Sequence, residues 1–144
     1  MVSRGASLAE VLVAVGVLAV LSLIAVPQLM VPAQVPAGQA ARGVAADLAL
    51  ARQLAIAGRT SYVVTFSPGA GPFTSYTVTP QGGTSAPDFP KVFPVGLTVI
   101  GTPQITFDPS GAASSDATVI LTAGSATAQV RVVGATGYVQ ETGP

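Results

Sequence analysis

The chain has 144 residues with six basic and six acidic side chains, so its net charge is zero and no basic surface for nucleic acid is indicated. It contains no cysteine, which excludes disulfides and thiolate chemistry, and no histidine, the commonest general base and metal ligand. Only 8% of the residues are charged, so we expect either much surface buried against neighbouring subunits or an exterior rich in Ser, Thr and Gly.

A long apolar segment lies near the start of the chain. From Leu8 to Val26 the only ionisable side chain is Glu10. A helix over Ala6–Val26 would be about 31 Å long at ~1.5 Å per residue, which matches a hydrocarbon core of ~30 Å. Arg4 precedes the segment and favours a cytoplasmic N-terminus. The sequence therefore predicts a single membrane-spanning helix, with the bulk of the chain outside the cytoplasm.

Glu10 is the unusual residue of this segment. A carboxylate in a membrane helix is costly and usually functional, with a partner that neutralises it. No basic residue occurs between Gly5 and Gln39, so a side-chain partner has to come from elsewhere. A simpler alternative is that Ser7-x-x-Glu10 is only a helix capping box. The segment would then be a plain anchor, or a secretory signal cut near Gly38-Gln39-Ala40.

A glycine, a small residue, a Ser-Leu pair and then a glutamate resemble the class III signal of type IV pilins and type II secretion pseudopilins (Gly5, Ser7-Leu8, Glu10). The resemblance implies that residues 1–5 are a leader and that prepilin peptidase cuts between Gly5 and Ala6. It also implies that Ala6 becomes the N-methylated N-terminus, and that Glu10 pairs with the terminal amine of a neighbouring subunit. Ala6 departs from the family pattern, which usually has Phe or Met there.

Three prolines follow the apolar segment: Pro27, Pro32 and Pro36. The resemblance implies that residues 6–31 form a transmembrane and filament-core helix that bends at Pro27. Because proline breaks or kinks a helix, we expect an irregular stretch through about Gly38. Residues 32–59 would then comprise a proline-rich break followed by an amphipathic helix.

Helical periodicity resumes from Gln39 to Gly58. One apolar stripe has 3-4 spacing, and a second, weaker stripe lies beside it (Ala41, Val44, Leu48, Ala51 and Ala55; Leu50, Leu54 and Ala57). The two stripes predict one face against the protein's own sheet and another against neighbouring helices in a filament, or else a well-buried helix in a monomer. We expect Gly58 to end the helix in the left-handed conformation.

The remainder, residues 60–144, is predicted to be β-structure. Short runs rich in Val, Ile, Thr, Tyr and Phe predict strands at Tyr62–Ser67, Thr74–Thr79, Leu97–Ile100, Ile105–Phe107, Thr118–Thr122, Thr127–Val133 and Tyr138–Gln140. Val130 and Val132 alternate with Gln129 and Arg131, which indicates a half-buried strand. The expected fold class is α+β, with one amphipathic helix packed on an antiparallel β-sheet.

This part resembles one branch of the family, the GspH/FimT-type minor pseudopilins. The resemblance rests on a helix end that runs into a strand and on two later stretches (Ala51-Arg52-x-x-Ala55-Ile56 with Gly58-Arg59 and Tyr62-Val63-Val64; Ile105 to Gly111; Gly137-Tyr138-Val139). It covers most of the chain and leaves the middle, Ser67 to Pro103, unmatched.

We considered three kinds of chemistry and favour none of them. Asp108 and Asp116 could contribute to a calcium site, but Asp-Pro-Ser-Gly is an ordinary turn and the spacing is not that of an EF-hand. The sequence shows no base near any serine, so we expect no serine nucleophile and no enzyme. We also expect no metal and no cofactor. Arg59 and Arg131 could touch DNA, but phosphate binding needs several cations.

The sequence thus predicts a structural subunit of a type IV pilus or type II secretion filament. It would be a single-pass inner-membrane protein with a periplasmic β-domain. Its expected partners are other pilin or pseudopilin subunits, prepilin peptidase, the inner-membrane assembly platform and membrane lipid. Two alternatives stay open: a pilus-tip or competence module that contacts DNA or a surface, and a plain membrane-anchored β-domain.

Overall fold

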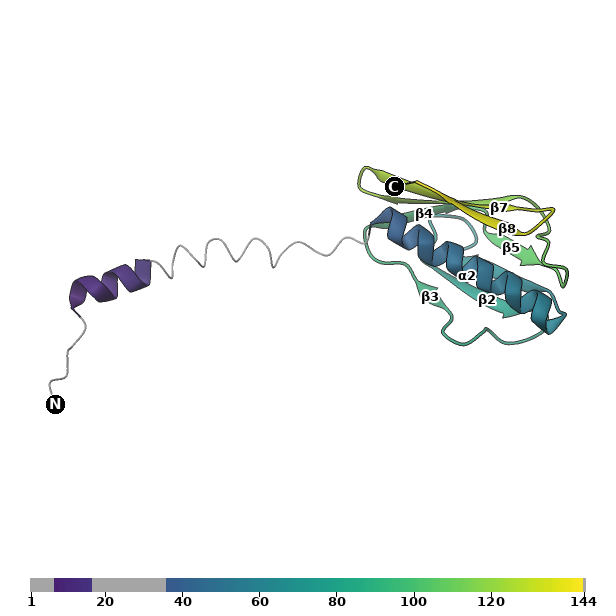
Figure 1. Ribbon diagram of the computed structural model, residues 1–144, viewed down its shortest axis with the longest axis horizontal. Coiled ribbons are helices and arrows are strands. Elements are labelled where there is room, and N and C mark those ends of the chain that lie inside the picture. The colour runs from purple at the N-terminus through teal and green to yellow at the C-terminus, as the bar shows by residue number, and fades with distance from the viewer. Residues whose placement is uncertain (1–6, 17–35, 144) are drawn as a thin grey trace. The chain divides into compact units, whose positions relative to one another are not determined.

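The computed structural model describes residues 7–16 and 36–143 (Figure 1). The chain divides between Ala33 and Gln34 into an N-terminal unit and a globular unit. Within the N-terminal unit, residues 8–16 are helical. Gly5, Ala6 and Pro27 lie outside the described residues, and so do the predicted leader and most of the predicted break. Among residues 7–16 and 36–143, no helix has the length and apolar character needed to cross a membrane.

Ser7 supplies the helix cap that the Ser7-x-x-Glu10 spacing predicted. The Glu10 N–H donates to the Ser7 hydroxyl oxygen at 3.3 Å and to the Ser7 carbonyl oxygen at 2.9 Å. The Val11 N–H also donates to that carbonyl, at 3.1 Å. These bonds satisfy donors that would otherwise lack a partner in the first turn of a helix.

The helix of the globular unit, α2 (Ala37–Gly58), differs from the prediction at both ends. The expected irregular stretch is wrong at its end, because α2 already includes Ala37 and Gly38: Pro36 is the N-cap and its carbonyl accepts from the Ala40 N–H at 3.1 Å. Proline is tolerated there because the first N–H groups of a helix have no partner within it. The part of the stretch before Pro36 lies outside the described residues. At the other end, Arg59 rather than Gly58 adopts the left-handed conformation, with φ 49°. The Arg59 N–H closes the last turn on Ile56, so the cap falls one residue later than expected.

The predicted core stripe of α2 is confirmed. Its five residues are all at most 2% exposed (Ala41, Val44, Leu48, Ala51 and Ala55). The second stripe stays at the surface of the globular unit, where Leu50 is 40% exposed, Leu54 is half-buried and Ala57 is exposed. The helix therefore buries one face in its own domain and leaves the other uncovered.

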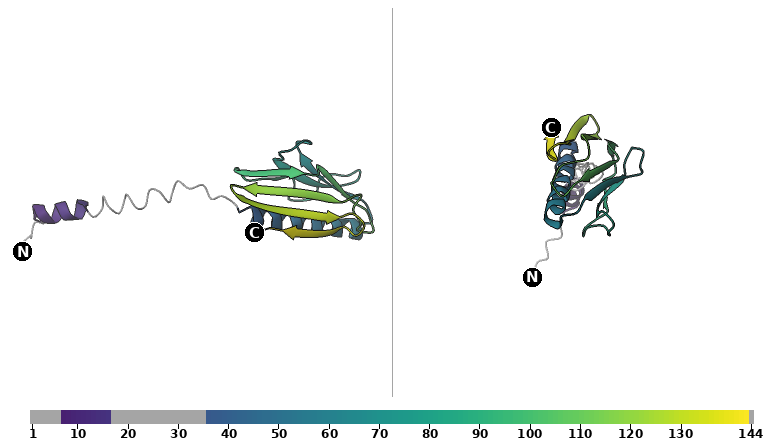
Figure 2. Two further views of the ribbon diagram at one scale, coloured as in Figure 1. Left: turned by 90° about the horizontal axis from the view of Figure 1, so that it is seen from above. Right: turned by 90° about the vertical axis from the view of Figure 1, so that its right-hand side faces the viewer.

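Eight strands in residues 36–143 form two four-stranded antiparallel sheets, with orders β3-β2-β1-β5 and β4-β6-β7-β8. The strands are β1 (Tyr62–Ser67), β2 (Ser75–Pro80), β3 (Lys91–Val92), β4 (Leu97–Gly101), β5 (Gln104–Phe107), β6 (Ala117–Ala123), β7 (Ala126–Val133) and β8 (Tyr138–Thr142). The helix α2 packs against strands of both sheets (Figures 1 and 2). The α+β fold is confirmed, and the division into two sheets is a feature that the sequence did not indicate.

All seven predicted strands are present, with ends shifted by at most two residues. The alternation in β7 is confirmed, since Val130 and Val132 are buried and Arg131 is exposed. The sequence missed β3, which pairs Lys91 with Tyr76 and Val92 with Ser75 of β2. A strand of two residues is too short to show a period of two.

The core lies between α2 and the two sheets. Its largest fully buried side chains include Phe66, Phe107 and Leu48. The Phe66 ring also lies 5.4 Å from that of Tyr76 and 5.3 Å from that of Phe73, measured between centroids. Among residues 7–16 and 36–143, all members of this core lie in the globular unit. Since burying one large apolar side chain stabilises a fold by ~1.5–3 kcal/mol, this unit has the core it needs to fold by itself.

Candidate functional site

The helical segment 8–16 presents apolar side chains without cover. Leu8 is 81% exposed and Leu12 is 65% exposed, and three valines beside them are at least half exposed (Val11, Val13 and Val15). Glu10 is exposed too, and it is the single ionisable residue among residues 7–16. A surface of this kind is stable only against lipid or against apolar protein.

The uncovered face of α2 is small and carries no charge. Residues at 3-4 spacing form it (Gly43, Ala46, Leu50, Gln53 and Ala57), and all five are exposed. The nearest cation, Arg42, lies beside this face and pairs with Glu141 of β8 at 3.6 Å. Three of the five residues are glycine or alanine, and such small residues let another backbone approach closely.

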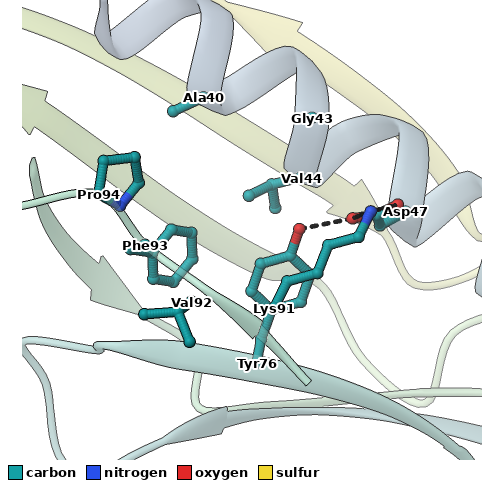
Figure 3. A pocket seen from close by; sticks show the side chains of 9 residues that line it. All are labelled: Ala40, Gly43, Val44, Asp47, Tyr76, Lys91, Val92, Phe93 and Pro94. Atoms are coloured by element: carbon teal, nitrogen blue, oxygen red, sulfur yellow. Dashed lines mark hydrogen bonds and ion pairs between the residues drawn. The ribbon is translucent and has the colours of Figure 1, made fainter. Parts of the chain in front are cut away.

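A buried carboxylate, which the sequence analysis did not single out, holds the edge of one sheet against α2. Asp47 is 7% exposed and accepts the Tyr76 hydroxyl at 2.5 Å and the Lys91 ammonium at 2.7 and 2.8 Å (Figure 3). Burial, followed by the bond to Asp47 and its charge, raises the pKa of Tyr76 well above its ordinary value. The Lys91 ammonium also lies 5.1 Å from the centre of the Phe89 ring.

The signal for Asp47 is present in the sequence. Asp47 lies three residues after Val44 and directly before Leu48, so it falls within the apolar stripe of α2. A carboxylate at a core-facing helical position needs a cation or several donors, because burying an unpaired charge is costly. The sequence does not reveal the partner, because Lys91 is 44 residues away.

A groove opens beside this cluster, between α2 and the segment that comprises β3 and the two residues after it. Its volume is about 190 Å³. Ala40, Gly43 and Val44 form the helix side, and the other side comes from the segment after Lys91 (Val92, Phe93 and Pro94). Figure 3 shows the Asp47 cluster at one end of the groove. The groove is therefore apolar along its walls and polar at one end.

A second set of contacts joins the C-terminal half of α2 to two loops. The Arg52 guanidinium donates to the Gly111 carbonyl at 3.0 Å. Gly137 has φ 62°, and a Cβ there would lie 1.9 Å from the same carbonyl oxygen. Only glycine fits this close approach. The residues that carried the resemblance at the helix end and near the C-terminus thus meet at one corner of the fold.

Asp108 is bonded within its own turn, and Asp116 is bonded to the segment around Gly134. An Asp108 oxygen accepts from the Ser110 hydroxyl, the Ser110 N–H and the Ala112 N–H, and the Ser110 hydroxyl is the main cause of the lowered pKa of Asp108. Asp116 accepts the Gly134 N–H at 2.7 Å, which is the main cause of its lowered pKa. In the part of the chain that the structure describes, no group of three His, Cys, Asp or Glu residues could hold a metal.

The two arginines considered for DNA have other contacts. Arg131 pairs with Asp116 at 3.5 Å on the surface of the sheet that contains β7. Arg59 forms the C-cap of α2. Among residues 36–143, the recorded contacts of these two arginines do not join them to other cations.

A comparison with protein families decides the class. The family profile of the type II transport protein GspH matches residues 40–137, more than half of the chain. The chain belongs to the GspH family. The match begins in the first turn of α2 and ends at Gly137, the residue packed on the Gly111 carbonyl. This member of the GspH family is thus a structural subunit of the pilin and pseudopilin class, as the sequence predicted.

Solved structures share the fold of this GspH-family chain. The minor pseudopilin EpsH from the type 2 secretion system of Vibrio cholerae matches with a TM-score of 0.63 at 15% identity, over 76% of this chain and 98% of that one. The type IV minor pilin FimU of Pseudomonas aeruginosa matches with a TM-score of 0.58 at 15% identity, over 74% of this chain and 87% of that one. A search of curated proteins found no match.

Proposed function

We propose that this GspH-family chain is a minor subunit of a type II secretion pseudopilus or a type IV pilus, held in the inner membrane by its N-terminal helix before assembly. The observation that carries the proposal is the uncovered apolar helix 8–16 with its single carboxylate, Glu10, in a chain whose globular unit has the GspH fold. FimU is a minor pilin and EpsH a minor pseudopilin, which supports a minor rather than a main subunit.

Prepilin peptidase removes residues 1–5 and methylates the new N-terminus at Ala6. The support for this step is the Gly5-to-Glu10 pattern and the helix that starts directly after Ser7. Cleavage removes Arg4 and leaves five basic against six acidic side chains. The new α-amino group belongs to Ala6, four residues before Glu10 in the sequence.

Glu10 neutralises the terminal amine of a neighbouring subunit. Its backbone N–H is already bonded to Ser7, and its side chain is exposed beside Leu8 and Leu12. In an apolar filament core, an unpaired carboxylate and an unpaired ammonium are each costly, and pairing them removes both penalties. The same pair sets the register between neighbouring helices.

The other proposed partners follow from membrane insertion, leader processing and filament assembly. They are further pilin or pseudopilin subunits, the peptidase, the assembly platform of the inner membrane, and lipid around the helix. Pro27 bends the helix where it leaves the apolar segment. We propose no catalytic role and no bound cofactor, and Arg131 has its own acidic partner on the sheet.

The test is the intact mass and the N-terminal peptide of the protein isolated from its native membranes. An N-methylated Ala6 is the expected result. A chain that still begins at Met1, or one that begins near Ala41, would contradict both the processing step and the role of Glu10. In that case the protein would be an anchored or secreted β-domain.

A further inference from the structure

The groove between α2 and β3 has the features of a site for an extended peptide. β3 is an edge strand, since β2 is its single partner in the sheet. The Phe93 N–H donates to the Thr74 carbonyl at 2.8 Å, and Val92 stands opposite Ser75. Backbone bonds alternate in an antiparallel pair, so the N–H and C=O of Val92 point away from β2.

These two groups of Val92 are open to a partner. Among residues 36–143, no hydrogen bond outside the strand ladder involves them, and the Val92 side chain is 75% exposed. Val92 also lines the groove. A free strand edge beside an apolar groove under a helix is an arrangement that binds an added strand.

Gly43 provides an independent reason to expect an occupant. A glycine inside a helix makes that helix less stable than an alanine at the same position would. A Cβ at Gly43 would meet no atom within 4 Å, so packing within the described residues does not explain the glycine. Gly43 is exposed on the helix wall of the groove. Its missing side chain leaves room for another chain to pass close to α2.

The charge at the end of the groove defines part of the occupant. The Lys91 side chain is 42% exposed, whereas that of Asp47 is 10% exposed, so the pair presents mainly its cation to solvent. Asp47 uses two of the three ammonium donors of Lys91. The remaining donor suits a carboxylate on the occupant.

We propose that this groove binds an extended segment of a different protein, which adds a strand to β3. Its apolar side chains, at alternate positions, enter the groove beside Gly43, and a carboxylate lies beside Lys91. The inference goes beyond the proposed function and does not depend on leader processing or on Glu10. Either can therefore fail without the other.

The test starts from the full chain in detergent micelles and a phage-displayed library of random heptapeptides. Selection on the wild type is compared with selection on Gly43→Leu, whose side chain fills the groove. We expect the wild type to enrich peptides with β-branched apolar residues at alternate positions and a carboxylate at one end. No enrichment, or the same enrichment on Gly43→Leu, would overturn the proposal.

The binding of an enriched peptide to variants at the edge strand β3 is then measured by fluorescence polarisation. Val92→Pro removes the outward N–H and leaves the bonds to β2 intact, so binding should weaken by about tenfold or more. Val92→Thr keeps the N–H and the side-chain shape and should bind like the wild type. Equal binding by the proline variant would show that no strand is added.

Circular dichroism melts establish that each variant is folded. Gly43→Ala is a smaller change on the same wall of the groove and should weaken binding less than Gly43→Leu does. Sedimentation across a range of protein concentrations tests the competing occupant. Self-association of the wild type that Val92→Pro abolishes would assign the groove to a second copy, and the proposed partner would then be wrong.

Discussion

The Lys91 ammonium lies 2.7 Å from a carboxylate oxygen of Asp47, and this ion pair joins the shortest strand of the fold to the middle of α2. Asp47 lies within the core stripe of the helix, between Val44 and Leu48. The pair, with the Tyr76 hydroxyl, holds the segment after the long 81–90 loop against the helix. It is therefore the polar contact on which the groove depends.

Replacing Lys91 should destabilise the globular unit through the carboxylate left behind. In Lys91→Met, Asp47 stays buried with Tyr76 as its remaining bonded side chain. We expect the free energy of unfolding to fall by about 2 kcal/mol, below the usual range for a broken buried pair because Lys91 is partly exposed. Urea unfolding of residues 36–144 measures it. The control is Arg131→Met in the surface pair with Asp116, expected to cost at most about 0.5 kcal/mol.

Tyr76 should make the protein sensitive to alkali. Its pKa is raised in the folded state, so above pH ~10 the unfolded chain loses the phenolic proton while the folded chain keeps it. The unfolded state then binds fewer protons, and stability falls as the pH rises. Tyr76→Phe lacks this proton, so its free energy of unfolding should decline less between about pH 9 and 11. Parallel declines in the two proteins would contradict the assignment.

Gly137 should tolerate no side chain. In Gly137→Ala the new Cβ would lie 1.9 Å from the Gly111 carbonyl oxygen, so a loop must move. We expect a loss of about 3 kcal/mol or more. Gly124 is the matched control, because it has a similar φ of 59° but nothing within 4 Å of its Cβ position. Gly124→Ala should cost only about 1–2 kcal/mol, from backbone strain alone. Similar losses at the two sites would mean that the close approach has little effect.

Glu10 should be needed for assembly and not for folding. Glu10→Ala leaves the core of the globular unit untouched, because Glu10 is exposed and is not one of the described residues that form that core. We expect this variant to stay in membranes and to be missing from sheared filaments, as followed by immunoblotting. Ser7→Ala is the control, since it removes only the cap at a cost of about 1 kcal/mol and keeps the charge. Normal incorporation of Glu10→Ala would disprove the proposed pairing.

Local patterns in the sequence are sufficient to predict α2 and seven of the eight strands in residues 36–143. The five core residues of α2 and the alternation in β7 recur at the period of their own element, so neighbours in the chain reveal which face is buried. The ends were less accurate. Pro36 and Arg59 occupy caps that depend on how the adjoining segments leave the helix.

The sequence by itself determined the class of this protein: an apolar helix with one carboxylate, followed by an amphipathic helix and a series of short strands. Only the tertiary structure decided the partition of those strands into two sheets and the pairing of Asp47 with Lys91. It also decided the contact of Gly137 with Gly111. The reason is that periodicity reports what a residue does within its own element. Contacts between residues tens of positions apart, or a strand of two residues, leave no periodic signal and arise only when the elements pack.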